Sequence, residues 1–263
     1  MSIPVVHHTQ PFPDCFDPTP ARPVTLTARD LVAADNVAPH THTFGQLTYA
    51  REGVIRLTAA GSSWIVPPSR AIWTAPGVVH EVTVLEPVRL RPVRIHAARS
   101  PFPGEDCRVL EVSTLLRELI LALEQLPQLE PSPRATLLSE LMLDELARSP
   151  ALPIRVPLPR DKRLQSLCER LLDEPGATHT LADWALQVGA SERTLARLFE
   201  RELGMSFTEW RQQVRLAHAA PLIARGMPLS RVAEELGYTS QSAFSHMFRK
   251  TFGCSPSAFF SQR

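Results

Sequence analysis

The sequence predicts a two-domain α+β protein, with an all-β N-terminal part, a helical linking region and an all-α C-terminal domain. Three observations predict this class. Short apolar–polar alternations run from Val24 to about Val112, apolar residues take helical spacing from about residue 113, and the last hundred residues contain an internal helical repeat. At 263 residues, the chain is long enough for two modest domains with separate cores.

Changes in composition and period divide the chain into four parts. Prolines near the start predict a flexible tail over residues 1–20. We expect a β barrel over residues 21–112, amphipathic helices and a proline-rich linker over 113–160, and the all-α domain over 161–263. The sequence contains no apolar run of about 20 residues that resembles a membrane span, and no signal peptide, which favours a cytoplasmic protein without a membrane partner.

The β region consists of short alternations separated by turn signals. The alternating segments are VTLTARDL, GQLTYARE, GVIRLTAAG, SSWIVPP, RAIWTAP, HEVTVLE and RPVRIHA. Gly, Pro or Glu-Pro breaks them at intervals of about 8–12 residues, which is typical of a small all-β barrel or sandwich.

Two leucine-rich segments follow the β region. STLLRELILALEQL and SPRATLLSELMLDELARS each place leucines at helical spacing, so each predicts an amphipathic helix. Four prolines between Pro150 and Pro159 then indicate an extended linker.

Charge and cysteine content say little about function. The net charge is +1, and residues 161–263 carry 13 basic against 11 acidic side chains, so charge alone does not indicate a nucleic-acid partner. The four cysteines lack the CxxC spacing of a zinc finger, and we expect them to be reduced in the cytoplasm. Any nucleic-acid function therefore has to be argued from motifs.

The strongest signal is the repeat in the last hundred residues. LADWALQVG (181–189) aligns with LSRVAEELG (229–237), and LARLFEREL (195–203) aligns with FSHMFRKTF (244–252). Each copy predicts a short helix that ends in Gly, which can adopt positive φ. A second helix then begins at Ser191 or Ser240, and serine is a good N-cap. Each copy is therefore predicted to be a helix-turn-helix unit.

A polar stripe remains on the second helix of each copy once the apolar positions are assigned to the core. One such stripe is equally well explained as a solvated helix face. Its presence in both copies favours a shared function for the two second helices. The helix between them, over about residues 207–225, would be roughly 28 Å long at 1.5 Å per residue. This length is near the ~34 Å between successive major-groove faces of B-DNA. Pro221 is expected to kink or end that helix.

The segment 231–260 reads RVAEELGYTSQSAFSHMFRKTFGCSPSAFF and closely resembles the signature of the AraC/XylS family of bacterial transcription regulators. The resemblance covers about residues 162–260. It depends on the spacing of Ala233, Gly237, Tyr238, Ser240, Phe244, Phe248, Gly253 and Pro256. It implies a seven-helix domain whose two helix-turn-helix units read adjacent major grooves of promoter DNA.

The same resemblance implies which side chains meet DNA. In the first unit, Arg193 and Arg197 would contact base edges, and Arg can bind guanine O6 and N7 together. The flanking Ser191 and Thr194 would lie at the same surface. In the second unit, bases would be faced by Ser242 and His246, and phosphates would be held by Thr239, Ser240, Gln241 and Arg249. His246 stands where relatives often carry Arg, so the second unit is expected to read DNA differently.

The β region resembles cupin barrels at two motifs. HTHTFGQL (40–47) is similar to the first conserved cupin box, with Gln46 where Glu is usual, and PGVVH (76–80) is similar to the second box. The resemblance implies a cupin-like barrel in which one divalent metal is bound by His40, His42, Gln46 and His80. Imidazole suits Zn, Ni, Fe or Cu. Because Gln46 removes the only anionic ligand, the alternative is a metal-free polar pocket for an organic effector.

Other features extend the resemblance. Trp73 precedes His80 by seven residues and is a candidate for the mouth of the effector pocket, with core packing as the alternative. The phrase WIVPPSRAIWTAPGVVH and the proline-rich linker resemble the subgroup of AraC-type proteins that regulate neighbouring efflux-pump genes. In this family, helices like those over residues 113–147 commonly pair two protomers, which implies a homodimer.

These features predict a dimeric, DNA-binding transcription regulator that is not an enzyme and responds to a small molecule or a metal in the barrel. Its expected partners are promoter DNA, the effector and, if it activates transcription, RNA polymerase. The first alternative is a cupin metalloenzyme with dioxygenase-like or isomerase-like chemistry. The second alternative is an architectural DNA-binding protein with a vestigial barrel.

Overall fold

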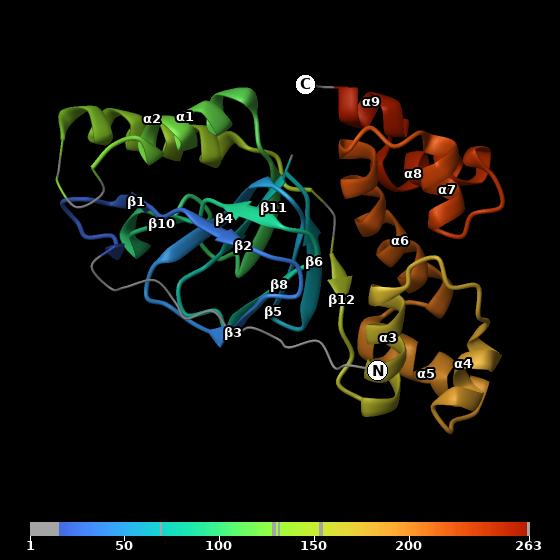
Figure 1. Cartoon of the computed structure of the whole chain (residues 1–263). Helices are drawn as coiled ribbons and strands as arrows, with labels where there is room; N and C mark the ends of the chain where they lie inside the picture. The colour runs from blue at the N-terminus through green and yellow to red at the C-terminus, as the bar shows by residue number, and fades with distance from the viewer. Residues whose placement is uncertain (1–15, 69, 128–129, 131, 153–154, 262–263) are drawn as a thin grey trace. The chain divides into compact units, whose positions relative to one another are not determined.

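The computed structural model describes residues 16–68, 70–127, 130, 132–152 and 155–261 (Figure 1). Most of the predicted tail, residues 1–15, lies outside the described residues. The chain divides into two compact units, Met1–Ala60 with Ile65–Pro153 and Gly61–Trp64 with Ile154–Arg263. The first unit is rich in strands and the second in helices, which confirms the predicted two-domain α+β class.

The first unit contains two antiparallel sheets, except that Ser62–Trp64, the first part of one strand, belong to the second unit. In chain order its strands are β1 (Val24–Leu26), β2 (Arg29–Leu31), β3 (Asn36–His40), β4 (Gly45–Glu52), β5 (Ile55–Ala59), β6 (Ser62–Val66), β7 (Arg70–Thr74), β8 (His80–Val84), β9 (Val88–Leu90), β10 (Val93–Ile95) and β11 (Cys107–Glu111). One sheet has the order β1-β10-β4-β7-β11, with β9 beside β4 and β2 beside β9. The other has the order β6-β5-β8-β3, and the short strand β12 (Val156–Pro157) pairs with β6.

Among the described residues, the two sheets do not close into a barrel. The predicted cupin-like barrel is therefore corrected to two open sheets. Irregular pairing accounts for part of this difference. The register of β3 against β8 shifts between Val37 and His40, and that of β4 against β9 shifts between Ala50 and Glu52. Such irregularities bend a strand and end regular pairing, and β3 lies at the edge of its sheet.

The larger sheet has one apolar face that two helices cover. Side chains alternate along β4, so Leu47 and Tyr49 lie on the same face, where they share a core with Trp73. The core is completed by leucines of α1 (Thr114–Glu124) and α2 (Pro133–Arg148). Figure 1 shows these two helices side by side along the sheet. The two amphipathic helices predicted from the leucine spacing are thus confirmed.

The second unit is helical after β12. Its helices are α3 (Lys162–Asp173), α4 (Leu181–Gln187), α5 (Glu192–Leu198), α6 (Phe207–Ala224), α7 (Leu229–Glu235), α8 (Gln241–Phe252) and α9 (Pro256–Ser261). A π-helical turn, Phe199–Leu203, continues α5. The pairs α4–α5 and α7–α8 are the two helix-turn-helix units that the repeat predicts.

The two units of the repeat have matching local geometry. Gly189 and Gly237 follow the first helices with φ of +65° and +70°, a conformation that favours glycine. Ser191 and Ser240 cap the second helices, and each side chain accepts a hydrogen bond from a backbone N–H three residues later. The glycine turns and serine caps that the sequence predicts are therefore present in both copies.

The helix between the two copies, α6, passes through Pro221. We predict a kink or an end there, but the helix continues to Ala224, one residue short of the predicted end. Proline cannot donate a hydrogen bond to the preceding turn. The backbone N–H of Arg225 donates to the carbonyl of Pro221, and Ala219 and Ala220 are buried, so the last turn is held by these contacts.

Candidate ligand cavity and helix-turn-helix surfaces

A row of mostly polar side chains crosses the inner face of the larger sheet. The register pairs Thr25 of β1 with Arg94 of β10, Arg94 with Gln46 of β4, Gln46 with Thr74 of β7, and Thr74 with Cys107 of β11. Directly paired residues share a face of a sheet. Because Leu47 and Trp73 occupy the opposite face, the polar row points away from the core that α1 and α2 cover.

A cavity of about 350 Å³ lies between the two sheets. Its lining comes from the segment before β1, from β2, β3, β4, β8, β9 and β10, and from the β3–β4 and β9–β10 connections. The residues are Asp17, Arg29, Val37, His40, Thr41, His42, Thr43, Phe44, Gln46, Thr48, Val82, Leu90, Pro92 and Arg94. This volume lies within the range of small-molecule sites, about 300–1,000 Å³.

Three histidines form a cluster, in which His40 and His42 line the cavity and the predicted pocket residue His80 stands outside the described lining. His40 ends β3 and pairs in register with His80, which begins β8, while His42 lies two residues beyond His40. The ring centroids are 4.3 Å apart for His40 and His80, 4.9 Å for His42 and His80, and 6.1 Å for His40 and His42. One ring nitrogen from each lies within 4.8 Å of the others. The structure thus brings together three of the four predicted metal ligands.

Backbone carbonyls fix the tautomer of all three rings. The Nδ1 atoms of His40, His42 and His80 lie 2.8, 2.6 and 3.1 Å from the carbonyl oxygens of Ala38, Phe44 and Val78, respectively. A carbonyl oxygen can only accept, so each neutral ring carries its proton on Nδ1 and a lone pair on Nε2. The Nε2 atoms of His42 and His80 are buried without a hydrogen-bond partner.

The buried rings are neutral at physiological pH. Burial, and after it the nearby His80, lower the pKa of His42 to about 4. Burial likewise lowers the pKa of His80 to about 4, against the opposing effect of its hydrogen bond to Val78. Neutral imidazoles with unprotonated Nε2 atoms are the form that binds a transition metal.

Gln46 and Trp73 have different positions relative to the cavity. Gln46 lines it, and its Nε2 donates to Thr48 Oγ1 at 3.1 Å, which leaves the amide oxygen as an acceptor. Trp73 is fully buried in the core on the other face of the sheet, where its ring packs edge-on against Phe102. Among the described residues that line the cavity, Trp73 is absent, because alternation along β7 turns its neighbour Thr74 inward instead.

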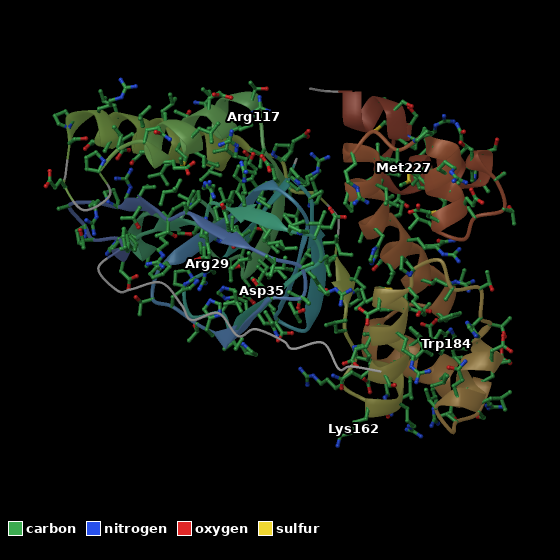
Figure 2. All side chains as sticks on the ribbon, in the orientation of Figure 1. Arg29, Asp35, Arg117, Lys162, Trp184 and Met227 are labelled. Atoms are coloured by element: carbon green, nitrogen blue, oxygen red, sulfur yellow. The ribbon has the colours of Figure 1, made fainter. Side chains whose placement is uncertain are left out.

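Sequence reasoning did not identify Arg94 as a cavity residue. Its side chain is buried, and its Nη1 lies 2.8 Å from Asp17 Oδ1. The guanidinium also lies 5.1 Å above the ring of Phe44, which stacks on His42 at 4.2 Å. The available signal was an arginine between Val93 and Ile95 in an otherwise apolar strand. A second lining arginine, Arg29, is labelled with its electrostatic partner Asp35 in Figure 2.

The helix-turn-helix units expose the predicted polar residues. Leu195 and Leu198 of α5 are buried, as are Phe244, Met247 and Phe248 of α8. The exposed side chains are Ser191, Arg193, Arg197, Thr239, Ser240, Gln241, Ser242, His246 and Arg249, and Thr194 is half-buried. The second helix of each unit therefore offers a polar face opposite its buried one. No helix within the described residues is long and apolar enough to cross a membrane.

Comparisons with known proteins cover both units. The family model for the AraC-like ligand binding domain matches residues 29–147, and that for a helix-turn-helix domain matches residues 184–262. The HTH-type transcriptional regulator NimR of Escherichia coli K12 is 34% identical over 218 residues, which are 82% of this chain and 80% of the relative. The HTH-type transcriptional regulator ExsA of Pseudomonas aeruginosa is 26% identical over 241 residues, 88% of this chain and 81% of the relative.

Proposed function

Because the chain belongs to the AraC family of transcription regulators, we propose that α5 and α8 enter successive major grooves of promoter DNA and that a small effector in the cavity changes this binding. The DNA-reading role is supported by the geometry that the two helix-turn-helix units share. Each unit offers an exposed polar face on a helix that follows a glycine turn and a serine cap. The second helix of a helix-turn-helix unit reads base edges, whereas phosphate contacts set its position.

Selection from a random-sequence DNA library tests the DNA-reading role. Full-length protein should enrich a motif of two short elements whose centres lie about 10 base pairs apart, one turn of B-DNA. Selection with Arg193→Ala should relax one element and leave the other intact. Enrichment of no motif, or of a single undivided element that both proteins share, would reject reading by two helices.

Exposed leucines on α1 and α2 support a homodimer. Leu137 is 72% exposed, and Leu115 and Leu141 are nearly half exposed, although the opposite faces of both helices are packed in the core. A cluster of exposed leucines is a common mark of a protein–protein interface. The proposed dimer would present two copies of the DNA-reading unit to a promoter in the cytoplasm. RNA polymerase is the further partner if the protein activates transcription.

The histidine cluster supports a second role for the cavity as a site for a divalent transition metal. His40, His42 and His80 offer three ring nitrogens, and hydrogen bonds from Nδ1 to backbone carbonyls orient the rings as in known metal sites. The amide oxygen of Gln46 is the candidate for a fourth ligand. This donor set fits Zn, Ni or Fe, and a bound metal would supply a cation at the cavity edge.

Zinc titration of chelator-treated protein tests the metal site. We expect one zinc per chain by plasma mass spectrometry, and loss of that zinc in a His40→Ala/His42→Ala double variant. His96→Ala is the matched control because His96 lies outside both the cluster and the cavity lining. Zinc uptake that is equal in all three proteins, or absent from all three, would reject the metal site and leave the cavity to an organic effector.

A further inference from the structure

Arg94 places a buried positive charge in the wall of the cavity. Its side chain is 4% exposed, and the register places it between Thr25 and Gln46 in the polar row. Removing a guanidinium from water is costly unless an anion lies beside it. The fold therefore requires a negative group at this point of the cavity.

The anion beside Arg94 is the carboxylate of Asp17, from the segment that precedes β1. Asp17 Oδ1 lies 2.8 Å from Arg94 Nη1. Asp17 also lines the cavity, and its side chain is 39% exposed, so solvent reaches the carboxylate that the buried guanidinium binds. The structure thus holds a carboxylate-binding position at the cavity wall, occupied by a partly exposed side chain.

The second arginine of the lining, Arg29, has an acidic neighbour outside the lining. Arg29 has Asp35 as its electrostatic partner, and Asp35 does not belong to the described cavity lining. At Arg94, by contrast, the carboxylate of the ion pair is itself part of the described lining. A ligand that enters the cavity therefore competes with Asp17 for Arg94.

The cavity combines its polar side chains with an apolar part. The ring of Phe44 lies beneath the Arg94 guanidinium at 5.1 Å, and Val37, Val82, Leu90 and Pro92 are the other apolar residues of the lining. A cavity of about 350 Å³ is near the lower limit for small-molecule sites. A ligand that suits this wall has one negative end and a short apolar body.

We propose that the effector is a small amphipathic monocarboxylate whose carboxylate binds Arg94 in place of Asp17 and whose apolar body packs against Phe44. The inference rests on the proposed role of the cavity as the effector site. Binding is noncovalent, and the ligand carboxylate takes the place of the Asp17 carboxylate beside Arg94.

Matched acid and amide pairs test this ligand class. Hexanoate with hexanamide, and benzoate with benzamide, are titrated by calorimetry into full-length, chelator-treated protein, which excludes binding through a metal. At least one acid should bind at concentrations up to about 10 mM, and at least tenfold more tightly than its amide, because a charge-assisted pair with arginine is lost in the amide. Absence of binding by both acids, or equal binding of acid and amide, would overturn the proposal.

Two variants locate the bound carboxylate. Arg94→Gln should weaken binding of the acid at least tenfold and leave the amide unchanged. Asp17→Asn removes the competing carboxylate and should strengthen binding of the acid by up to about fivefold, the typical worth of a partly exposed ion pair. If Arg94→Gln does not fold, the Asp17→Asn variant provides the test. Acid binding that is unchanged or weaker in that variant would overturn the proposal that the ligand carboxylate replaces Asp17.

The DNA selection separates this inference from the proposed function. If the two-element motif is enriched but no acid binds more tightly than its amide, the proposed DNA-reading function is supported and the proposed carboxylate ligand is wrong. If acids bind through Arg94 but no motif is enriched, the cavity is assigned correctly and the DNA-reading proposal is wrong.

Discussion

Acidification should destabilise the first unit because His42 and His80 are buried in their neutral form. Burial is the main cause that lowers the pKa of each to about 4, from an ordinary value near 6.5. Between these two values, the unfolded chain binds protons that the folded chain does not bind. The contribution to the unfolding free energy is therefore fully present above about pH 6.5 and is lost as the pH falls toward 4.

The magnitude follows from the two pKa values. At pH 5, an unfolded imidazole is almost fully protonated, whereas a buried imidazole with a pKa of about 4 is mostly neutral. Proton linkage then removes about 2 kcal/mol of unfolding free energy per histidine between pH 8 and pH 5. Both histidines together would remove about 4 kcal/mol, a large part of the 5–15 kcal/mol that is typical of native proteins.

Urea unfolding of chelator-treated protein between pH 8 and pH 5 measures this loss. His80→Gln should show half of the pH dependence or less, whatever its stability at pH 8, because it also removes the effect of His80 on the pKa of His42. His246→Gln, which removes an exposed imidazole from the second unit, should retain the wild-type dependence. Equal unfolding free energies at pH 8 and pH 5, or a His80→Gln curve as steep as wild type, would refute the reasoning.

Three further changes test other parts of the structure. Gly45→Ala should cost about 1–3 kcal/mol in urea unfolding because its Cβ would lie 1.9 Å from the Trp73 ring, and Trp73→Phe in the same chain should recover part of that loss. In fluorescence anisotropy, Arg193→Ala should lower discrimination between bases at particular positions by about 1–3 kcal/mol. Arg249→Ala should instead weaken binding to all sequences and reduce the slope of log affinity against log salt concentration by about 1. Identical behaviour of the two variants would contradict the assigned roles. Leu137→Asp should shift sedimentation from dimer to monomer, and an unchanged sedimentation coefficient would remove α2 from the interface.

The helical half of the fold was predictable because its signals are local. A glycine turn, a serine cap and apolar residues at helical spacing lie within each copy, residues 181–203 and 229–252, and the repeat provides an internal check. The course of α6 through Pro221 was not predictable in the same way. Pro221 removes one hydrogen bond from α6, but the neighbouring Ala219 and Ala220 are buried. A local sequence pattern does not reveal that burial.

The candidate site was only partly predictable because it depends on pairing between distant strands. The spacing of His40 and His42 and the motif around His80 predicted a cluster that the structure brings together. The sequence of β7 does not show which of its side chains face the cavity. Trp73 was therefore a cavity candidate, but it lies in the core and its neighbour Thr74 faces the cavity side. The contact of Asp17 with Arg94 joins residues 77 positions apart, and no local pattern indicates it.

The central claim is that this chain reads a specific DNA sequence under the control of its cavity. The most direct measurement is the dissociation constant of full-length protein for its selected DNA duplex and for a scrambled duplex of equal composition, at physiological salt. Both constants are measured without ligand and with the acid, hexanoate or benzoate, that binds the cavity. We predict a preference of about 10³ or more for the selected duplex and a change in that preference when the ligand is added. Equal affinity for both duplexes, or a preference that no ligand alters, would contradict the account.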